Sequence, residues 1–280
     1  MGEDRKREPA PIVKWAGGKR RLLDRILPLI PEHDIYYEPF FGGGAVLFAL
    51  KPEKAVINDS NADLMDIYRV IKSEPEKLIA LLEEHAEKDC KDYYYEVRAM
   101  DRDFDRYESL SDAERAARFL YLNKTCFNGL FRVNRSGEFN VPYGRYKNPE
   151  IVGAEGIRAI SEYLNEAKIR ILSQDYREVF RGIRENAFVY MDPPYMPISE
   201  TSSFTGYTAA GFDRQQQTEL KKQCDKLDRK GVKFMLSNSS CDFITKLYRD
   251  YHIEHVSAPR SVNAKADGRG RVEELLIMNY

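Results

Sequence analysis

Cysteine is scarce in this chain, with four residues among 280, and none of them belongs to a CxxC pair. The thiols are scattered at Cys90, Cys126, Cys224 and Cys241. Closely spaced cysteines are the usual signature of a zinc site or of a disulfide framework. The sequence therefore predicts reduced thiols in a cytosolic protein and no metal site.

The chain also lacks the apolar stretches of membrane and secreted proteins. Residues 1–8 are charged and contain no apolar core of the signal-peptide kind. Gly2 does not belong to a myristoylation motif, because Lys6 occupies the position that takes Ser or Thr. No apolar run is long enough to span a bilayer. We expect a cytoplasmic protein without a membrane partner.

The chain also lacks an excess of positive or negative charge, since its net charge is −1. This balance argues against a generally basic, nucleic-acid-coating surface, but it allows local basic patches. No internal repeat or low-complexity tract is present. The length fits one large α/β domain or two smaller ones.

Short apolar runs alternate with helical stretches over much of the chain. Helical patterns occur around 155–165 and 213–229, and such alternation is typical of a parallel sheet built from βαβ units. From residue 62 to 122 the strand signal disappears and helical periodicity replaces it. We predict an α/β fold whose sheet has about seven strands and is interrupted by a helical insertion. The expected strands are 36–38, 55–58, 169–172, 187–191, 232–238, 251–254 and 272–280.

The tetrapeptide Asp192-Pro193-Pro194-Tyr195 follows the apolar run 187–191, so a buried parallel strand would deliver it at its carboxyl end. Ligands bind at that edge of open α/β sheets. Two consecutive prolines have no N–H, so the segment offers a carboxylate and carbonyls with few competing donors. A planar amine such as the adenine amino group, lying on Tyr195, could donate to Asp192 and to the Pro193 carbonyl. The alternative is an ordinary strand with a proline turn, in which Tyr195 only packs.

Two glycine-containing segments precede helical patterns near the amino end. In Lys14-Trp15-Ala16-Gly17-Gly18-Lys19 the glycines could let the backbone approach an anion or ligand, or could form a plain turn. Trp15, the only tryptophan, either covers a flat ligand or is a half-buried core residue. The second segment, Gly42-Gly43-Gly44, follows an expected strand but lacks the G-x-G-x-x-G spacing of dinucleotide sites.

About fifteen residues beyond this glycine turn, Asp59 closes the expected strand 55–58. An acidic residue at the tip of the second strand is placed to accept both hydroxyls of a ribose. Asp59 could instead cap the following helix, as Ser60 and Asn61 also could. Strand, glycine turn and acidic strand tip together indicate an adenosine-containing cofactor without identifying it.

The segment from Asn123 to Lys147 differs in composition from the rest of the chain. Basic residues alternate there with Asn, aromatic and turn-forming residues, and Glu138 is its only acid. Arg and Asn side chains read base edges, and aromatic side chains stack on bases or wedge between them. A solvated hairpin with ordinary surface charge is the alternative, and no named DNA-binding motif is present. The loop from Arg260 to Arg271 is a second basic segment, without an apolar anchor.

Five motifs in this order resemble those of the Dam-type DNA adenine-N6 methyltransferases, and especially the GATC-modifying enzymes, including those paired with restriction systems. They are Lys14 to Lys19, Glu38-Pro39-Phe40-x-Gly42-Gly43-Gly44, Asn128-Gly129-Leu130-x-Arg132-x-Asn134, Phe139-Asn140-Val141-Pro142-x-Gly144-Arg145-Tyr146 and Asp192 to Tyr195. The resemblance runs from about Pro11 to the last residue. It implies a Rossmann-like class I S-adenosylmethionine-dependent methyltransferase domain, 1–61 and 153–280. A mainly helical target (DNA) recognition domain, 62–152, is inserted into it.

The resemblance also implies the cofactor and catalytic residues, position by position. Asp59 matches the residue that holds the cofactor ribose, and Asp175 matches the acid that faces the cofactor adenine. The catalytic motif is Asp192, Pro193, Pro194 and Tyr195. The implied residues for S-adenosylmethionine, whose product is S-adenosylhomocysteine, are Trp15, Lys19, Glu38, Phe40, Gly42, Gly44, Asp59, Asp175 and Asp192.

For double-stranded DNA, the resemblance implies contacts from the amino end and from the basic segment. Lys14 and Arg132 match residues at guanines, and Leu130 and Pro142 match contacts near the thymine. Phe127, a tyrosine in some relatives, matches with Asn128 the pair that fills the space left by the extruded base. The full implied set is Lys14, Phe127, Asn128, Leu130, Arg132, Asn134, Pro142, Arg145 and Tyr146. Some relatives have Ala or Ser at one position of the glycine turn, which leaves the expected activity unchanged.

The expected reaction is methylation of adenine N6 within GATC, on a base flipped out of the duplex because the target atom is paired inside it. Competing interpretations are a methyltransferase of RNA or another planar amine, and a catalytically silent DNA-binding protein. A nicotinamide oxidoreductase is disfavoured by the glycine spacing. We expect no obligate protein partner, and a restriction endonuclease as a companion if the chain serves a restriction system. The two basic segments would supply phosphate contacts.

Overall fold

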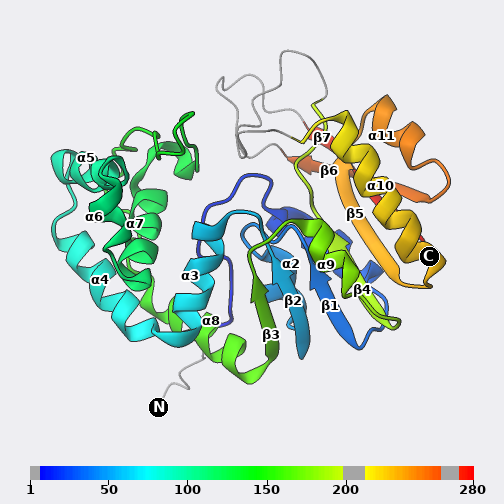
Figure 1. The fold of residues 1–280 in the computed structure, drawn as a ribbon, viewed down its shortest axis with the longest axis horizontal. Coiled ribbons are helices and arrows are strands. Elements are labelled where there is room, and N and C mark those ends of the chain that lie inside the picture. Colours follow the sequence, from blue (N-terminus) through cyan, green and yellow to red (C-terminus); the bar gives the residue numbers. More distant parts are fainter. Residues whose placement is uncertain (1–6, 198–211, 260–270) are drawn as a thin grey trace. The chain divides into compact units, whose positions relative to one another are not determined.

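The computed structural model describes residues 7–197, 212–259 and 271–280 (Figure 1). The predicted loop 260–271 therefore lies almost wholly outside the described residues. The chain forms two compact units. Unit 1 comprises Met1–Gly18, Gly42–Lys51 and Asn61–Ile171, and unit 2 comprises Lys19–Phe41, Pro52–Ser60 and Leu172–Tyr280. The predicted recognition segment 62–152 lies within unit 1, and its role in DNA recognition stays a prediction.

Unit 1 is mostly helical, which confirms the helical pattern predicted for residues 62–122. Pro75, at the first position of its helix, and a capping box between Ser111 and Glu114 mark two of the helix starts. Helix α7 (Asp112–Thr125) packs against both α3 (Ala62–Ser73) and α4 (Pro75–Glu87) (Figure 1). The elements are α2 (Ala45–Leu50), α3 (Ala62–Ser73), α4 (Pro75–Glu87), α5 (Lys91–Ala99), η3 (Met100–Arg102), α6 (Phe104–Glu108), α7 (Asp112–Thr125), η4 (Phe127–Gly129) and α8 (Ala154–Glu166).

The basic segment that follows α7 is an irregular hairpin. Two isolated bridges, Cys126 with Tyr143 and Val133 with Phe139, hold its arms together. Regular strand pairing does not occur among its residues, all of which are described. Scattered backbone hydrogen bonds, such as that from the Asn140 amide to the Arg132 carbonyl, therefore shape the hairpin together with side-chain contacts.

The sheet has seven strands, as predicted, in the order β3-β2-β1-β4-β5-β7-β6. Strand β1 is parallel to β2 and β4, and β4 is parallel to β5. The parallel pairing that the alternation of strands and helices indicates gives way at the carboxyl end, where β7 is antiparallel to both β5 and β6. The connection 260–270 is shorter than the dozen or more residues that a parallel crossover needs. The strands are β1 (Ile35–Glu38), β2 (Lys54–Asn58), β3 (Lys168–Leu172), β4 (Ala187–Met191), β5 (Lys233–Ser239), β6 (His252–Pro259) and β7 (Arg271–Met278).

The core of unit 2 is built on the central strand β4, every residue of which is buried. Val189 and Met191 face a cluster to which the helices α9 (Tyr176–Arg181), α10 (Arg214–Arg229) and α11 (Asp242–Leu247) contribute apolar side chains. Such a strand, buried on both faces, reads as a continuous apolar run, which is why the sequence reveals it.

The segment before β1 is helical, as the apolar pattern of Leu22, Leu23, Ile26 and Leu27 predicts. It consists of three short consecutive elements, η1 (Lys19–Leu22), α1 (Leu23–Ile26) and η2 (Leu27–Leu29). Pro28 lies within the last of them and cannot donate a backbone hydrogen bond, so a longer helix would be broken there.

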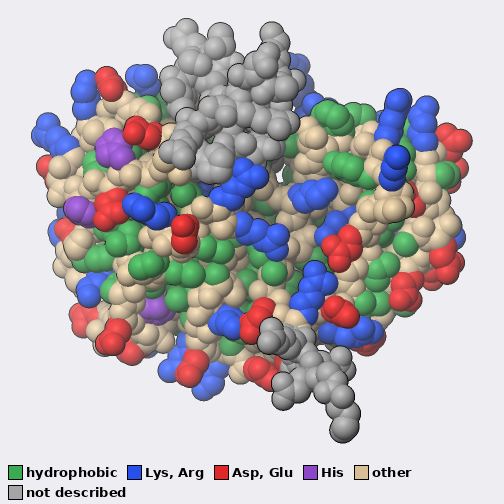
Figure 2. Space-filling model, turned by 180° about the vertical axis from the view of Figure 1, so that it is seen from behind, with side chains coloured by type: hydrophobic (Ala, Val, Ile, Leu, Met, Phe, Trp, Pro, Cys, Tyr) green, Lys and Arg blue, Asp and Glu red, His purple; other side chains and the backbone are tan. Residues whose placement is uncertain are grey.

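The described surface carries both charge signs. On the face in Figure 2, Lys and Arg side chains are interspersed with Asp and Glu, in keeping with the net charge of −1. In the described parts of the chain, we find no helix with the length and apolar character needed to cross a membrane. The four cysteines are free thiols, of which Cys126 and Cys224 are buried.

Candidate functional site

The tetrapeptide 192–195 lies where the sequence places it, directly after β4 and beyond the last residue of that strand. Its parallel neighbours β1 and β5 end at the same edge, because parallel strands share one direction. Pro193 is buried, whereas the Asp192 side chain keeps 20% of its exposure. The carboxylate is therefore within reach of a ligand at this edge.

Lys19 is a buried cation beside this carboxylate. Its side chain is 4% exposed, and its Nζ lies 2.8 Å from Asp192 Oδ2 and 4.8 Å from the centre of the Tyr195 ring. Burial raises the pKa of Asp192 to about 6, although the Lys19 ammonium acts in the opposite direction. Near neutral pH Asp192 is thus a carboxylate that accepts hydrogen bonds, and it becomes protonated in mild acid.

Glu274, on β7, joins the same group of side chains. The Tyr195 hydroxyl donates a hydrogen bond of 2.6 Å to Glu274 Oε2, which also lies 3.8 Å from Lys19 Nζ. Burial, followed by the charges of Asp192 and Glu274, raises the pKa of Tyr195 well above its usual value. The Tyr195 hydroxyl therefore remains protonated and acts as a donor.

Polar side chains from α10 and β5 fix the loop that follows the tetrapeptide. Gln217 Nε2 donates to the Pro194 carbonyl at 2.9 Å, and its Oε1 accepts from Asn238 Nδ2 at 3.0 Å. The Met196 amide donates to Asn238 Oδ1, and its carbonyl accepts from Ser239 Oγ. The Pro193 carbonyl has no hydrogen-bond partner among the residues that the structure describes, so it can accept one from a ligand.

Asn58 ties the ends of β1 and β2 to the segment before α9. Its Nδ2 donates to the carbonyls of Pro39 and Gln174, and its Oδ1 accepts from the Gln174 amide at 3.0 Å. Asp59, which is partly buried, comes directly after it. This connection brings the predicted acids Asp59 and Asp175 to one region of unit 2.

The remaining cofactor residues predicted in unit 2 have structural partners there. Glu38 is 2% exposed and accepts a hydrogen bond from the Tyr36 hydroxyl. Phe40 packs against Tyr176, with ring centres 5.0 Å apart. Asp175 caps α9 and accepts two hydrogen bonds from the Arg177 guanidinium, which lowers the pKa of the carboxyl group.

Asp59 does not cap α3, the alternative role considered for it. The N-cap residue of α3 is Asn61, whose side chain accepts from the Leu64 amide at 3.0 Å. Helix capping therefore does not account for Asp59 at the strand tip, and ribose binding by Asp59 remains a prediction.

In unit 1, Trp15 is half-buried, as one of its two predicted roles requires. Its ring stacks on Phe131 at 5.5 Å, and Phe131 stacks in turn on Phe119. Gly42 has a φ of +51°, and a Cβ there would lie 2.8 Å from the Trp15 ring. The ring edge thus requires glycine at this position of the turn. Contact of Trp15, Gly42 and Gly44 with a cofactor stays a prediction.

Several residues predicted to contact DNA lie together in unit 1. The Asn123 side chain bonds the amide and carbonyl of Lys14, and Lys14 Nζ lies 4.7 Å from the centre of the Tyr146 ring. Phe127 is 51% exposed and Tyr146 36%, which is unusual for large aromatic side chains. A hydrogen bond from the Phe127 amide to the Pro142 carbonyl joins the two arms.

Backbone conformation around Phe127 is specialised. Asn128 has a φ of +57°, and the following Gly129 has a φ of +61°. A Cβ on Gly129 would lie 2.2 Å from Lys14 Cδ, so only glycine fits beside this lysine. Leu130, which is partly buried, continues the chain into the hairpin. The predicted residues Lys14 and 127–130 are thus brought together by close backbone packing.

Arg132 is exposed, and an asparagine supports it. Its Nε donates to Asn140 Oδ1 at 2.7 Å and its Nη2 donates to the Asn140 carbonyl at 3.1 Å. This leaves the Nη1 side of the guanidinium fork free of any bond to described residues. Asn134 shapes the hairpin turn, because its Oδ1 accepts from the amides of Ser136 and Glu138. Arg145 is also exposed and has a φ of +55°.

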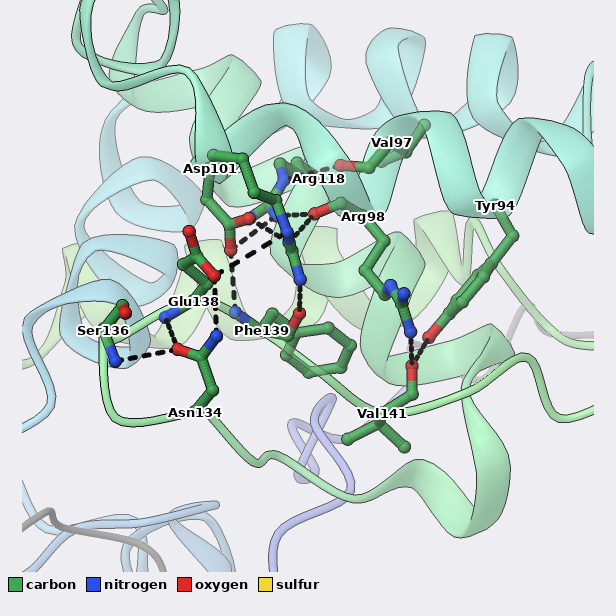
Figure 3. Close-up of polar contacts among 11 residues, drawn as sticks. Tyr94, Val97, Arg98, Asp101, Arg118, Asn134, Ser136, Glu138, Phe139 and Val141 are labelled. Carbon is green, nitrogen blue, oxygen red and sulfur yellow. Dashed lines mark hydrogen bonds and ion pairs between the residues drawn. The ribbon is translucent and has the colours of Figure 1, made fainter.

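A largely buried carboxylate, that of Asp101, attaches the hairpin to the helices (Figure 3). Asp101 accepts a hydrogen bond of 2.8 Å from the Phe139 amide and pairs with Arg118 at 2.9 Å. Arg102 bonds Asp101 and donates to the Phe139 carbonyl at 2.6 Å. At the next inward-facing position, the Tyr94 hydroxyl donates to the Val141 carbonyl. Side chains of α5 and η3 therefore hold the hairpin in addition to the bonds between its two arms.

Sequence reasoning missed several residues of both regions. Glu274, Gln217, Asn238 and Asp101 belong to no motif, and their partners lie far away in the chain. One signal was present for Glu274, a carboxylate at the edge of the apolar run Leu275-Leu276-Ile277-Met278. Charged residues rarely enter such runs without a partner.

We compared the chain with known protein families and with individual proteins of known name. Residues 15–262 match the family model described as "D12 class N6 adenine-specific DNA methyltransferase". The chain is 49% identical to the type II methyltransferase M1.LlaDCHI of Lactococcus lactis subsp. cremoris, over 96% of this chain and 95% of that protein. It is 45% identical to the type II methyltransferase M.MjaIII of Methanocaldococcus jannaschii, over 98% and 100% of the two chains. The identity to the DNA adenine methylase of Escherichia coli K12 is 32%, over 95% and 94%.

Proposed function

Because the chain belongs to the D12-class N6 adenine-specific DNA methyltransferases, we propose that it methylates adenine N6 within GATC of duplex DNA, using S-adenosylmethionine. The observation that carries this proposal is the edge of unit 2 at which Asp192, the Pro193 carbonyl and the Tyr195 ring lie in one fixed loop. Two hydrogen-bond acceptors beside an aromatic face match an aromatic amine with two N–H groups.

The hydrogen-bond acceptors of unit 2 fit S-adenosylmethionine. This cofactor carries an ammonium group, ribose hydroxyls and an adenine amine, all of which donate hydrogen bonds, and it supplies an electrophilic methyl group on sulfur. Asp59 and Asp175 offer carboxylates at the strand ends that Asn58 ties together. Binding the adenine amine through Asp175 would compete with its contact to Arg177.

For catalysis, Asp192 and the Pro193 carbonyl would each accept one hydrogen of the target amine, so that its lone pair is no longer delocalised into the ring and can attack the methyl group. The N–C bond would form as the methyl–sulfur bond breaks, which leaves S-adenosylhomocysteine. The nitrogen would then carry one proton too many, and Asp192 would be the base in contact with that proton. Tyr195 would stack on the flipped base. Catalysis then consists mainly of positioning, which contributes large rate factors when the reacting atoms are held in line.

For recognition, the exposed residues of unit 1 would contact the duplex. Lys14 and Arg132 are the proposed readers of guanine, and Phe127 with Asn128 would occupy the space of the extruded adenine. Arg132 suits its role because Asn140 holds one side of the guanidinium and leaves the other for a base edge. Leu130, Asn134, Pro142, Arg145 and Tyr146 complete the proposed contacts, and 62–152 is the proposed recognition domain.

Two of the similar proteins named above are type II methyltransferases. We therefore propose that this chain acts alongside a restriction endonuclease that cleaves the same unmethylated site. The presence of an endonuclease gene beside its own would support this role, and its absence would favour a methylase that acts alone.

Transfer of a labelled methyl group from S-adenosylmethionine to oligonucleotides tests the proposal. The panel contains GATC duplexes, duplexes with one base of the site changed, and duplex RNA of the same sequence. Label confined to GATC DNA supports the whole proposal. Label at another adenine-containing DNA site would keep the mechanism but contradict the base contacts, and label on RNA alone would contradict the substrate.

A further inference from the structure

The carboxylate of Glu274 lies in a largely buried part of the sheet, where a charged group loses most of its hydration. Glu274 precedes the buried residues 275–278 of β7, and its side chain keeps 17% of its exposure. In the sheet it lies between Ser239 of β5 and Val256 of β6, so its backbone is paired on both sides. A carboxylate in such surroundings is stable only if hydrogen bonds or opposite charges compensate for lost hydration.

The compensating groups of Glu274 are the side chains of the candidate active site. Its Oε2 accepts the Tyr195 hydroxyl at 2.6 Å and lies 3.8 Å from Lys19 Nζ. The same ammonium contacts Asp192 Oδ2 at 2.8 Å and lies over the Tyr195 ring. Tyr195 is therefore held at its hydroxyl end by Glu274 and on one face by Lys19.

We propose that Glu274 is a positioning residue for methyl transfer, which fixes the Tyr195 ring and shares Lys19 with Asp192. With the ammonium over one face of Tyr195, the target adenine stacks on the opposite face. Lys19 interacts with both carboxylates, so its positive charge compensates that of Asp192 only in part. Asp192 therefore remains a strong acceptor for the N6 hydrogen. This role rests on the proposed function.

The charges around Asp192 provide a signature of this arrangement. Lys19 from η1, Glu274 from β7, Tyr195 from the same loop and Tyr190 from β4 face the carboxyl group. After burial and Lys19, the negative charge of Glu274 raises the pKa of Asp192. Removing that charge lowers this pKa, so Asp192 stays ionised to lower pH.

The test compares Glu274→Gln with Glu273→Gln, the same chemical change at the neighbouring residue. Glu273 is the matched control because its side chain is 63% exposed and points to the other face of β7. Single-turnover rates of methyl transfer to GATC duplex are measured from pH 5 to 8. We expect Glu274→Gln to slow transfer about tenfold through misplacement of the ring and amine. Glu273→Gln should remain within about twofold of the wild type, as surface substitutions usually do.

Two further results separate positioning from a purely structural role. The acid limb of the rate profile moves to lower pH in Glu274→Gln, whereas Glu274→Asp, which keeps the charge, slows transfer and leaves the limb in place. In a Tyr195→Phe background, Glu274→Gln has less effect than in the wild type, because the hydroxyl that it holds is already gone. Wild-type-like transfer and an unmoved acid limb in Glu274→Gln would overturn the inference. Failure of the wild type to methylate any DNA would instead overturn the proposed function, and this inference with it.

Discussion

Removal of the Asp101 charge should loosen the hairpin that carries Arg132. Asp101 is 12% exposed and pairs with Arg118, which is 6% exposed, and it also accepts the Phe139 amide. Taking one partner from a buried ion pair destabilises a protein by about 3–5 kcal/mol. Arg118 keeps its bonds to the carbonyls of Val97 and Arg98, so we expect Asp101→Asn to fall near the lower limit, about 3 kcal/mol.

Hydrogen exchange of the Phe139 amide measures this effect locally. If the Asp101→Asn variant holds the hairpin more weakly by about 3 kcal/mol, that amide exchanges about a hundredfold faster, because each 1.4 kcal/mol is a factor of ten. Urea unfolding gives the corresponding change in the free energy of unfolding of the whole chain. Asp105→Asn, an exposed substitution on the neighbouring α6, is the control and should change stability by less than about 0.5 kcal/mol. Equal Phe139 exchange in Asp101→Asn and wild type would refute the role given to Asp101.

Asp192→Ala should lower single-turnover methyl transfer by at least about a thousandfold through loss of positioning, with DNA affinity nearly unchanged in a gel-shift titration; retained turnover would remove Asp192 from the mechanism. Because burial raises the pKa of Asp192 to about 6 and only the carboxylate accepts the amine hydrogen, the wild-type rate should fall as pH drops through about 6, and a flat profile from pH 5 to 8 would contradict this. Arg132→Ala should lower the preference for GATC over sites with a changed guanine about tenfold to a hundredfold, measured by competition between duplexes, and an unchanged preference would exclude Arg132 as a base reader.

The strands and the tetrapeptide could be predicted because their signals are local. Residues 187–191 form a continuous apolar run, and a run of that kind followed by Asp192 fixes the carboxylate at the end of a buried strand. Helices in 62–122 were likewise predictable, since apolar periodicity is a local pattern in the chain.

What could not be predicted depends on partners distant in sequence. Glu274 meets Tyr195 across 79 positions, and Asp101 meets Phe139 across 38, so neither contact has a local pattern. The antiparallel direction of β7 depends on which strand it pairs with, which an apolar run does not specify. Asp59 shows the same limit in another way, because three adjacent residues were suitable helix caps and only Asn61 takes that role.

Methylation of adenine N6 in DNA can be measured by digesting enzyme-treated duplex DNA to nucleosides and identifying the methylated product by mass spectrometry, for the wild type and Asp192→Ala. We expect N6-methyldeoxyadenosine from the wild type, restricted to duplexes that contain GATC, and none from the variant. A methylated cytosine, or no methylated base from the wild type, would contradict this expectation.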